Sequence, residues 1–196
     1  MRDEQLGPMG NPKYLGYAGD IFESARHALD VINAMLTETP GEVRTFGPVD
    51  LSEIAVATVS VMQPLARTSG INLEADCSEE RLQVTGDATA IRQIIYNLIS
   101  NALKFTPQGG EVHVVTGYLP KGVPFFVVRD TGEGMSEDDI VRAFYRDDTS
   151  IGARRGGGYG IGLPMVLRLA EMMQATIDVD SEPGKGTVVL VTFPNP

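Results

Sequence analysis

Three polar residues lie in a segment that otherwise carries core-type side chains. Asn97, Asn101 and Lys104 are spaced four and three residues apart, so a helix places them on one face. An amide oxygen can ligate Mg²⁺, and a lysine ammonium can neutralise a phosphate. The spacing therefore favours a site for a metal-bound phosphate, although a solvated polar face fits it equally well.

An aspartate followed by glycines ends an apolar strand-like run. The segment is Val127–Arg129 followed by Asp130-Thr131-Gly132-Glu133-Gly134-Met135. A carboxylate at a strand end can accept a hydrogen bond from an adenine amino group. Glycine permits positive φ and close approach of a ligand to the backbone. The alternative is a plain Asp-Thr-Gly turn.

A glycine run, Gly156–Leu163, directly precedes an amphipathic helix. Its free N–H groups and the helix N-terminus form a suitable cradle for phosphate, which Arg154 and Arg155 could reach. A flexible loop is the alternative. A Walker A loop is excluded because Lys185 is followed by glycine, and a Rossmann loop because no strand immediately precedes the glycines.

Periodicity and capping residues predict the elements that must position these segments. Asp50 and Asp87 suit helix N-caps, and residues 42–49 are expected to form a linker. Residues 143–160 exceed a usual connection and are interpreted as a lid. The expected helices span about 17–38, 51–68, 88–105, 137–143 and 163–173, and the expected strands 71–75, 111–118, 124–129, 175–180 and 186–193.

Because helices and strands mix without strict alternation, we expect an α+β fold. It is a two-layer α/β sandwich, a mixed sheet with helices on one face, preceded by one helix. The closing strands are expected to be antiparallel.

Composition excludes several classes of protein. The 196 residues are 42% hydrophobic, and no stretch approaches the roughly 20 apolar residues of a membrane span. Cys77 is the only cysteine, which suits a reducing cytoplasm. The net charge of −10 disfavours nucleic acid and anionic membrane surfaces as partners. We therefore expect a cytoplasmic chain whose positive potential is local to a nucleotide site.

Four segments in order resemble the ATP-binding domain of sensor histidine kinases. Asn97–Phe105 resembles the N box, Asp130–Met135 the first glycine box, and Gly158–Leu163 the second; Gly186-Thr187-Val188-Val189 resembles the last box. The resemblance covers roughly residues 47–194. It implies the Bergerat-type sandwich, with the ATP-binding domain over 47–196.

The resemblance also implies roles for individual residues. Asn101 would ligate Mg²⁺, and Asn97 and Lys104 would contact phosphates and form the catalytic pair. Asp130 would accept from the adenine amino group, with Thr187 nearby through water. The complete expected nucleotide site is Asn97, Asn101, Lys104, Phe105, Asp130, Gly132, Gly134, Met135, Arg155, Gly158, Gly160, Ile161, Gly162, Leu163 and Thr187, with ATP and Mg²⁺ as cofactors.

Residues 16–40, after a flexible lead-in over 1–15, resemble the second helix of the dimerisation and phosphotransfer hairpin of these kinases. The acceptor motif of the first helix, a histidine followed by an acidic residue and a proline, is not found here. His27 lacks those neighbours, and His113 lies in an expected strand. The implied partners are therefore a phosphoacceptor histidine helix outside this chain, a response-regulator receiver domain, and a second copy in a homodimer. The parent protein can be membrane-anchored elsewhere.

Relatives of this fold that hydrolyse ATP, such as DNA gyrase, have a glutamate at the position of Asn97. An amide cannot take the proton that such a general base takes. The expected activity is therefore transfer of the γ-phosphate to a histidine, for relay to a response-regulator aspartate. Two alternatives remain open: a serine kinase of the anti-sigma-factor type, and a degenerate kinase or adaptor that binds a partner without catalysis. Residues Ala143–Arg146 stand where the family often has a longer F box.

Overall fold

The computed structural model describes residues 17, 45–78, 81–145 and 162–195. The chain divides into two units, and every helix and strand with described bounds belongs to the second, Val43–Asp147 with Gly162–Pro196. Several predictions lie outside the described residues. They concern the lead-in over 1–15, the helix over 16–40 apart from Tyr17, the lid from residue 146 onward, and Arg155, Gly158, Gly160 and Ile161 of the site; residues 143–145, predicted as the start of the lid, are helical.

A five-stranded mixed sheet forms one layer of this unit. Its order is β2 (Asn72–Asp76), β4 (Glu111–Leu119), β5 (Val123–Asp130), β7 (Gly186–Thr192) and β6 (Thr176–Glu182). β2 pairs with β4 in parallel, and the other neighbours pair antiparallel. The expected mixed sheet and antiparallel closing strands are confirmed.

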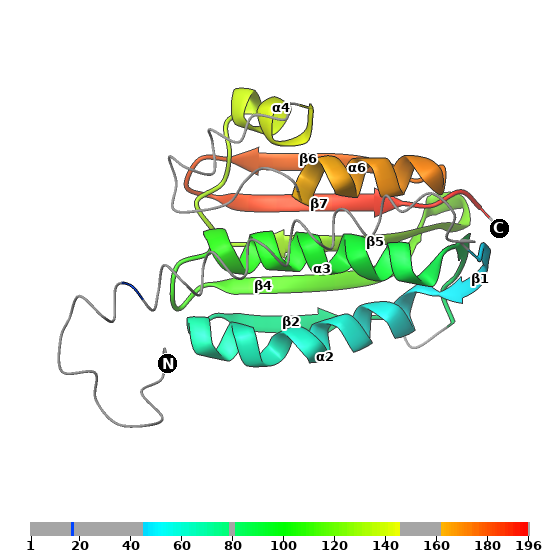
Figure 1. Ribbon diagram of the computed structural model, residues 1–196, viewed down its shortest axis with the longest axis horizontal. Helices are drawn as coiled ribbons and strands as arrows, with labels where there is room; N and C mark the ends of the chain where they lie inside the picture. The colour runs from blue at the N-terminus through cyan, green and yellow to red at the C-terminus, as the bar shows by residue number, and fades with distance from the viewer. Residues whose placement is uncertain (1–16, 18–44, 79–80, 146–161, 196) are drawn as a thin grey trace. The chain divides into compact units, whose positions relative to one another are not determined.

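Helices α2 (Leu51–Ser69), α3 (Ala88–Phe105) and α6 (Gly162–Met172) cover one face of the sheet (Figure 1). The shorter α4 (Glu137–Tyr145) follows the loop that leaves β5. This arrangement confirms the α+β two-layer sandwich. Among the described residues, no helix is long and apolar enough to cross a membrane.

The two long helices begin where the sequence predicts. The Asp50 side chain accepts hydrogen bonds from Ser52 N and Glu53 N at 3.1 and 3.2 Å. Asp87 Oδ1 accepts from the first-turn amides of α3 at 2.8 and 2.9 Å. Each cap satisfies amides that have no partner within the helix. Gly70 then ends α2 with φ +67°, a left-handed conformation that suits glycine.

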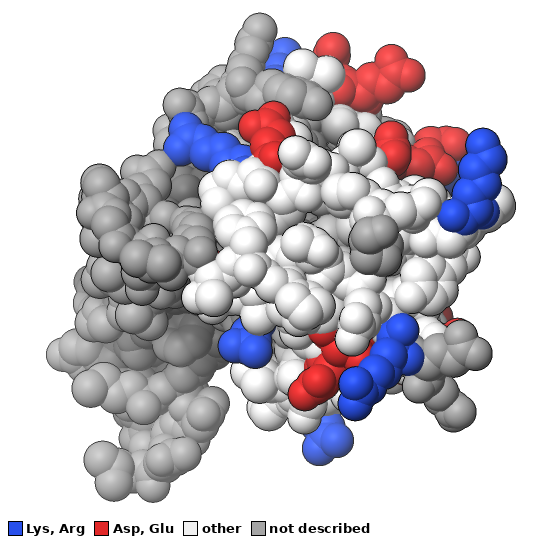
Figure 2. Space-filling view, turned by 90° about the vertical axis from the view of Figure 1, so that its right-hand side faces the viewer, with Lys and Arg blue, Asp and Glu red and all other residues white. Residues whose placement is uncertain are grey.

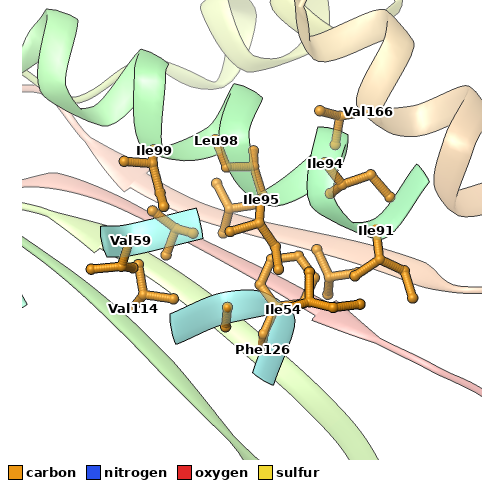
Figure 3. Packing of buried hydrophobic residues seen from close by; sticks show 14 of the residues in the cluster. Ile54, Val59, Ile91, Ile94, Ile95, Leu98, Ile99, Val114, Phe126 and Val166 are labelled. Atoms are coloured by element: carbon orange, nitrogen blue, oxygen red, sulfur yellow. The ribbon is translucent and has the colours of Figure 1, made fainter. Parts of the chain in front are cut away.

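Helix α3 is held at the centre of the core. Its buried face presents isoleucines and a leucine to α2, to the sheet and to α6 (Figure 3). The labelled contacts join Ile91, Ile94, Ile95, Leu98 and Ile99 of α3 to Ile54 and Val59 of α2, Val114 and Phe126 of the sheet, and Val166 of α6. This packing fixes the rotation of α3, and hence the direction of its polar face.

A small second sheet was not expected. β1 (Gly47–Asp50) pairs antiparallel with β3 (Gln83–Gly86), so the predicted linker over 42–49 is wrong from Gly47 onward. Each strand has only four residues, and β1 contains a proline, so neither shows an alternation that could be recognised in the sequence.

At the end of the unit that carries β1, charged side chains are scattered around a mainly uncharged surface (Figure 2).

Candidate active site

The three predicted polar residues of α3 lie outside its buried face. Asn97 and Asn101 are half-buried and Lys104 is exposed, whereas Leu98, Ala102 and their apolar neighbours are buried. The Asn101 amide makes no hydrogen bond to any described residue. An amide at the border of the core that has no such partner is free to ligate a metal ion or a phosphate.

The Asn97 side chain contacts a residue of its own helix, α3, and a residue of α6. Its Oδ1 accepts from Gln93 Nε2 at 3.4 Å, and its Nδ2 lies 3.8 Å from the Met165 sulfur of α6. Two turns further along α3, Lys104 Nζ lies 5.2 Å from the centroid of the Phe105 ring. The helix thus presents two amides and an ammonium in a row toward the C-terminal end of α3.

Asp130 is the last residue of β5 and stands in register with Thr187 of β7. Its Oδ1 accepts from Gly132 N at 2.8 Å and from Thr187 N at 3.2 Å. The first contact is a local aspartate turn, so the plain-turn interpretation is partly correct. Oδ2 has no hydrogen-bond partner among the described residues, and one acceptor therefore remains for a ligand.

Burial changes the acidity of this carboxyl group. Desolvation raises the pKa of Asp130, and the two backbone hydrogen bonds from Gly132 and Thr187 offset it only in part. A desolvated carboxylate gains more from an additional N–H donor than one in water does.

The loop after β5 is tied to the end of α3. Glu133 N donates to the Phe105 carbonyl at 3.1 Å, and a Cβ added at Gly132 would lie 2.5 Å from that same oxygen. The aspartate–glycine segment and the asparagine segment, about 30 residues apart, are therefore joined at one carbonyl. The sequence led us to expect that these glycines admit a ligand; the structure gives them a further reason, which is close approach of two parts of the backbone.

The hairpin of β6 and β7 holds the same loop from the other side. Gly184 N donates to the Glu133 carbonyl at 2.6 Å, and Met135 N donates to Ser181 Oγ at 2.8 Å. Ser181 Oγ also donates to the Gly186 carbonyl and contacts Thr187 Oγ1, both at 3.0 Å.

Sequence reasoning missed Ser181. The signal that could have found it is a hydroxyl on the core-facing side of β6, where Ile177 and Val179 are the other members.

Helix α6 begins beside the asparagine face. A Cβ placed on Gly162 would lie 3.8 Å from Asn101 Nδ2. Leu163, in the first turn, is partly buried against the core and so fixes the start of the helix. The first-turn amides of α6, which carry partial positive charge, therefore lie close to Asn101.

These residues fit a nucleotide with its metal ion. The described residues hold no cluster of three His, Cys, Asp or Glu side chains that could bind a metal. A metal at Asn101 would draw on phosphate and water for further ligands, which is the coordination that Mg²⁺ accepts readily. The free oxygen of Asp130 suits an amino donor.

The raised pKa of Asp130 predicts a pH-dependent difference in stability between wild type and Asp130→Asn. A group whose pKa is raised by folding stabilises the fold below its unfolded pKa, about 4, and loses that contribution as pH rises through the folded pKa. We expect the free energy of unfolding of wild type to fall relative to the variant over that interval. Urea denaturation of both proteins from about pH 3.5 to 7 measures this difference in the free energy of unfolding. If the free energy of unfolding of wild type rises relative to the variant over this interval, the prediction is contradicted.

Comparisons with known proteins identify the family of the chain. Residues 86–196 match the family model described as "Histidine kinase-, DNA gyrase B-, and HSP90-like ATPase". The cell-division control histidine kinase PdhS of Brucella suis is 34% identical over 99% of this chain, which spans 20% of the PdhS length.

Solved structures give the same result. Full-length ShkA, determined in complex with AMPPNP, is 28% identical and covers 94% of this chain and 39% of its own, with a TM-score of 0.70. The catalytic domain of histidine kinase ThkA shares the fold at 20% identity and a TM-score of 0.67, covering 76% of this chain and 95% of its own. The chain therefore belongs to the histidine kinase-, DNA gyrase B- and HSP90-like ATPases, and its ATP-binding domain is of the sensor histidine kinase type.

Proposed function

We propose that this chain binds ATP with Mg²⁺ and transfers the γ-phosphate to a histidine presented by another segment or protein. The observation that carries the proposal is the site at the end of β5. There a desolvated carboxylate, Asp130, keeps one free oxygen and is joined through Phe105 to the helix that carries Asn101. The Asp130 end of such a site suits a purine, and the Asn101 end suits metal-bound phosphates.

The adenine end is built from β5 and β7. Asp130 Oδ2 accepts from the exocyclic amino group, while Oδ1 stays occupied by two backbone donors that fix the carboxylate plane. Thr187, the register partner of Asp130, is close enough to complete the recognition through water. Met135, half-buried and held by Ser181, contributes apolar surface to the ring.

The phosphate end is built from α3 and α6. Asn101 would hold Mg²⁺, and Asn97 and Lys104 would contact phosphate oxygens. The N-terminal amides of α6 at Gly162 add positive potential. Arg155, Gly158, Gly160 and Ile161 remain predicted contributors.

A metal ion held by Asn101 would neutralise charge on the phosphates, and the chain itself supplies position rather than a base. An imidazole nitrogen of the acceptor forms the new N–P bond as the bond from the γ-phosphorus to the bridging oxygen breaks, and ADP leaves. Asn97 cannot accept a proton from water, so hydrolysis without an acceptor stays slow. We do not assign His113 as the acceptor; it lies in β4, where its ring nitrogens are 3.6 Å from Glu74 and 3.2 Å from Glu111.

Relay to a receiver domain follows from the type of domain. The ThkA structure in complex with the response regulator TrrA shares 18% identity with this chain and supports only the fold. We propose that a phosphohistidine partner, a receiver aspartate and a second copy of the chain are the macromolecules involved, in the cytoplasm.

A segment exchange tests the transfer. The aligned segment of Brucella suis PdhS, one fifth of that protein, is replaced by this chain, and the chimera is given ATP and Mg²⁺. We expect incorporation of an acid-labile, alkali-stable phosphate, as an N–P bond requires, and its loss in Asp130→Asn. An acid-stable, alkali-labile phosphate would favour the serine-kinase alternative. Tight ATP binding with no incorporated phosphate would favour the adaptor.

The metal role of Asn101 makes a separate prediction. Asn101→Ala should weaken ATP binding about 10-fold in the presence of Mg²⁺ and leave Mg²⁺-free binding nearly unchanged, because one metal ligand is lost. Calorimetry with ATP, with Mg²⁺ and with EDTA, measures both values. Ser100→Ala on the same turn of α3 serves as the control. Equal losses in the two conditions contradict the assignment.

A further inference from the structure

The sheet face that turns away from α2, α3 and α6 carries an apolar strip. Its residues are half-buried and do not belong to the core or to the side chains packed against it. They come from the three central strands: Val115 of β4, Phe125 and Val127 of β5, and Val188 and Leu190 of β7. We call this set the open-face strip.

The strand register places the strip in contiguous rows. Val115 pairs with Val127, and Val127 pairs with Leu190, so three apolar side chains cross the centre of the sheet. Phe125 continues the strip along β5, and its ring covers Gly117, where an added Cβ would lie 3.2 Å from a ring carbon. The strip is therefore continuous over β4, β5 and β7.

Acidic residues border the strip on both edge strands. On β2, Asp76 stands in register with Val115; on β6, Asp178 stands in register with Leu190 and Asp180 with Val188. All three aspartates are exposed. From β2 to β6, the row through Val127 therefore consists of Asp76, Val115, Val127, Leu190 and Asp178.

The basic groups on this face lie toward one end of it. Arg129 and His113 share the next row, where His113 contacts Glu74 and Glu111. Lys185 pairs with Glu182 beyond the end of β6. The apolar row through Val127 therefore keeps its acidic border, whereas the Phe125 row continues into Thr192 and Thr176 and carries no charge.

We propose that the open-face strip binds an amphipathic helix whose apolar face is flanked on both sides by Lys or Arg. Four strand spacings separate β2 from β6, about 19 Å. A helix is about 10–12 Å wide, so lysines on its two flanks reach the two acidic edges. The eight residues of β5 extend about 27 Å, the length of an 18-residue helix, and the exposed Arg129 lies on this face near the Asp130 end of the strand, beyond the apolar strip.

Charge argues against the other occupants. A second copy packed face to face would bring acidic edges together, and nucleic acid or an anionic membrane would meet the same borders. A helix with an apolar face and positively charged flanks is the occupant that both the apolar strip and its acidic edges stabilise.

The probe is a synthetic 18-residue peptide of leucine and lysine, with leucines at i, i+3, i+4 and i+7 spacing. Titrated into the ¹⁵N-labelled chain, it should shift amide resonances of β4, β5 and β7. Leu190→Lys should weaken binding at least about 10-fold, and Val127→Thr, which keeps the β-branched shape, by a smaller factor. Val61→Lys, an equal change at a 72% exposed site on α2, is the control and should have no effect.

A second pair of variants separates local from bulk charge. Asp178→Asn with Asp180→Asn should weaken peptide binding, whereas Glu137→Gln with Asp138→Asn, in the exposed first turn of α4, should not. Equal effects of both pairs would overturn the proposal, as would shifts confined to the helix layer. Concentration-dependent dimerisation that Leu190→Lys abolishes would assign the strip to a second copy instead.

Discussion

Asp130→Asn should bind ATP about 100-fold more weakly than wild type while keeping its fold. The asparagine Oδ1 can still accept from Gly132 N and Thr187 N, so the loop and β7 stay tied. An amide NH₂ replaces the free oxygen, however, and points a donor at the adenine amino group. A lost charge-assisted hydrogen bond and an unmatched donor cost about 3 kcal/mol, which is about 100-fold in affinity.

Asp180→Asn is the matched control for this variant. It makes the same chemical change at an exposed position of β6, in the same sheet but outside the site. Calorimetry with ATP and Mg²⁺ should give a wild-type affinity for this protein. An Asp130→Asn protein that is folded by circular dichroism and binds as tightly as wild type would remove the adenine assignment.

Gly134→Ala should destabilise the domain by about 2–5 kcal/mol. Gly134 has φ +65°, where an L-residue costs about 1–2 kcal/mol. A Cβ there would also lie 1.9 Å from the Glu182 carbonyl oxygen, a backbone atom held in the β6–β7 hairpin, so the overpacking costs about 1–3 kcal/mol more. The thermal midpoint should fall by about 10 °C.

Gly122→Ala measures the conformational cost of a positive φ without a steric clash. Gly122 has φ +78°, but nothing lies within 4 Å of an added Cβ, and its turn is at the far end of β5 from Asp130. We expect only the conformational cost, about 1–2 kcal/mol. Equal midpoints for the two variants in thermal denaturation would show that the contact with Glu182 is not tight.

Most elements were predictable because their signals are local. Asp50 and Asp87 cap α2 and α3 through amides two and three residues away, and Gly70 ends α2 with its own backbone angle. β4 and β5 were predictable as short runs rich in β-branched and aromatic residues that are bounded by turn residues. The β1–β3 pair was not predictable, since each four-residue strand depends on a partner more than 30 residues away.

The candidate site also combines features that residue types predicted with contacts that they did not predict. Side-chain chemistry and spacing indicated Asn97, Asn101, Lys104 and Asp130, and the structure brings their segments together. Backbone contacts were not readable: the Phe105 carbonyl receives Glu133 N, and a hydroxyl of Ser181 holds Met135 N. Such contacts depend on where two distant segments meet, which residue types alone do not specify.

Binding of an ATP analogue to the purified chain is the first property to measure. The purified chain is titrated by calorimetry with AMPPNP, the analogue bound in the ShkA structure, once with Mg²⁺ and once with EDTA. We expect saturable one-site binding that Mg²⁺ strengthens and that Asp130→Asn weakens about 100-fold. No binding of a folded chain at millimolar analogue would contradict it, and the adaptor alternative would then take its place.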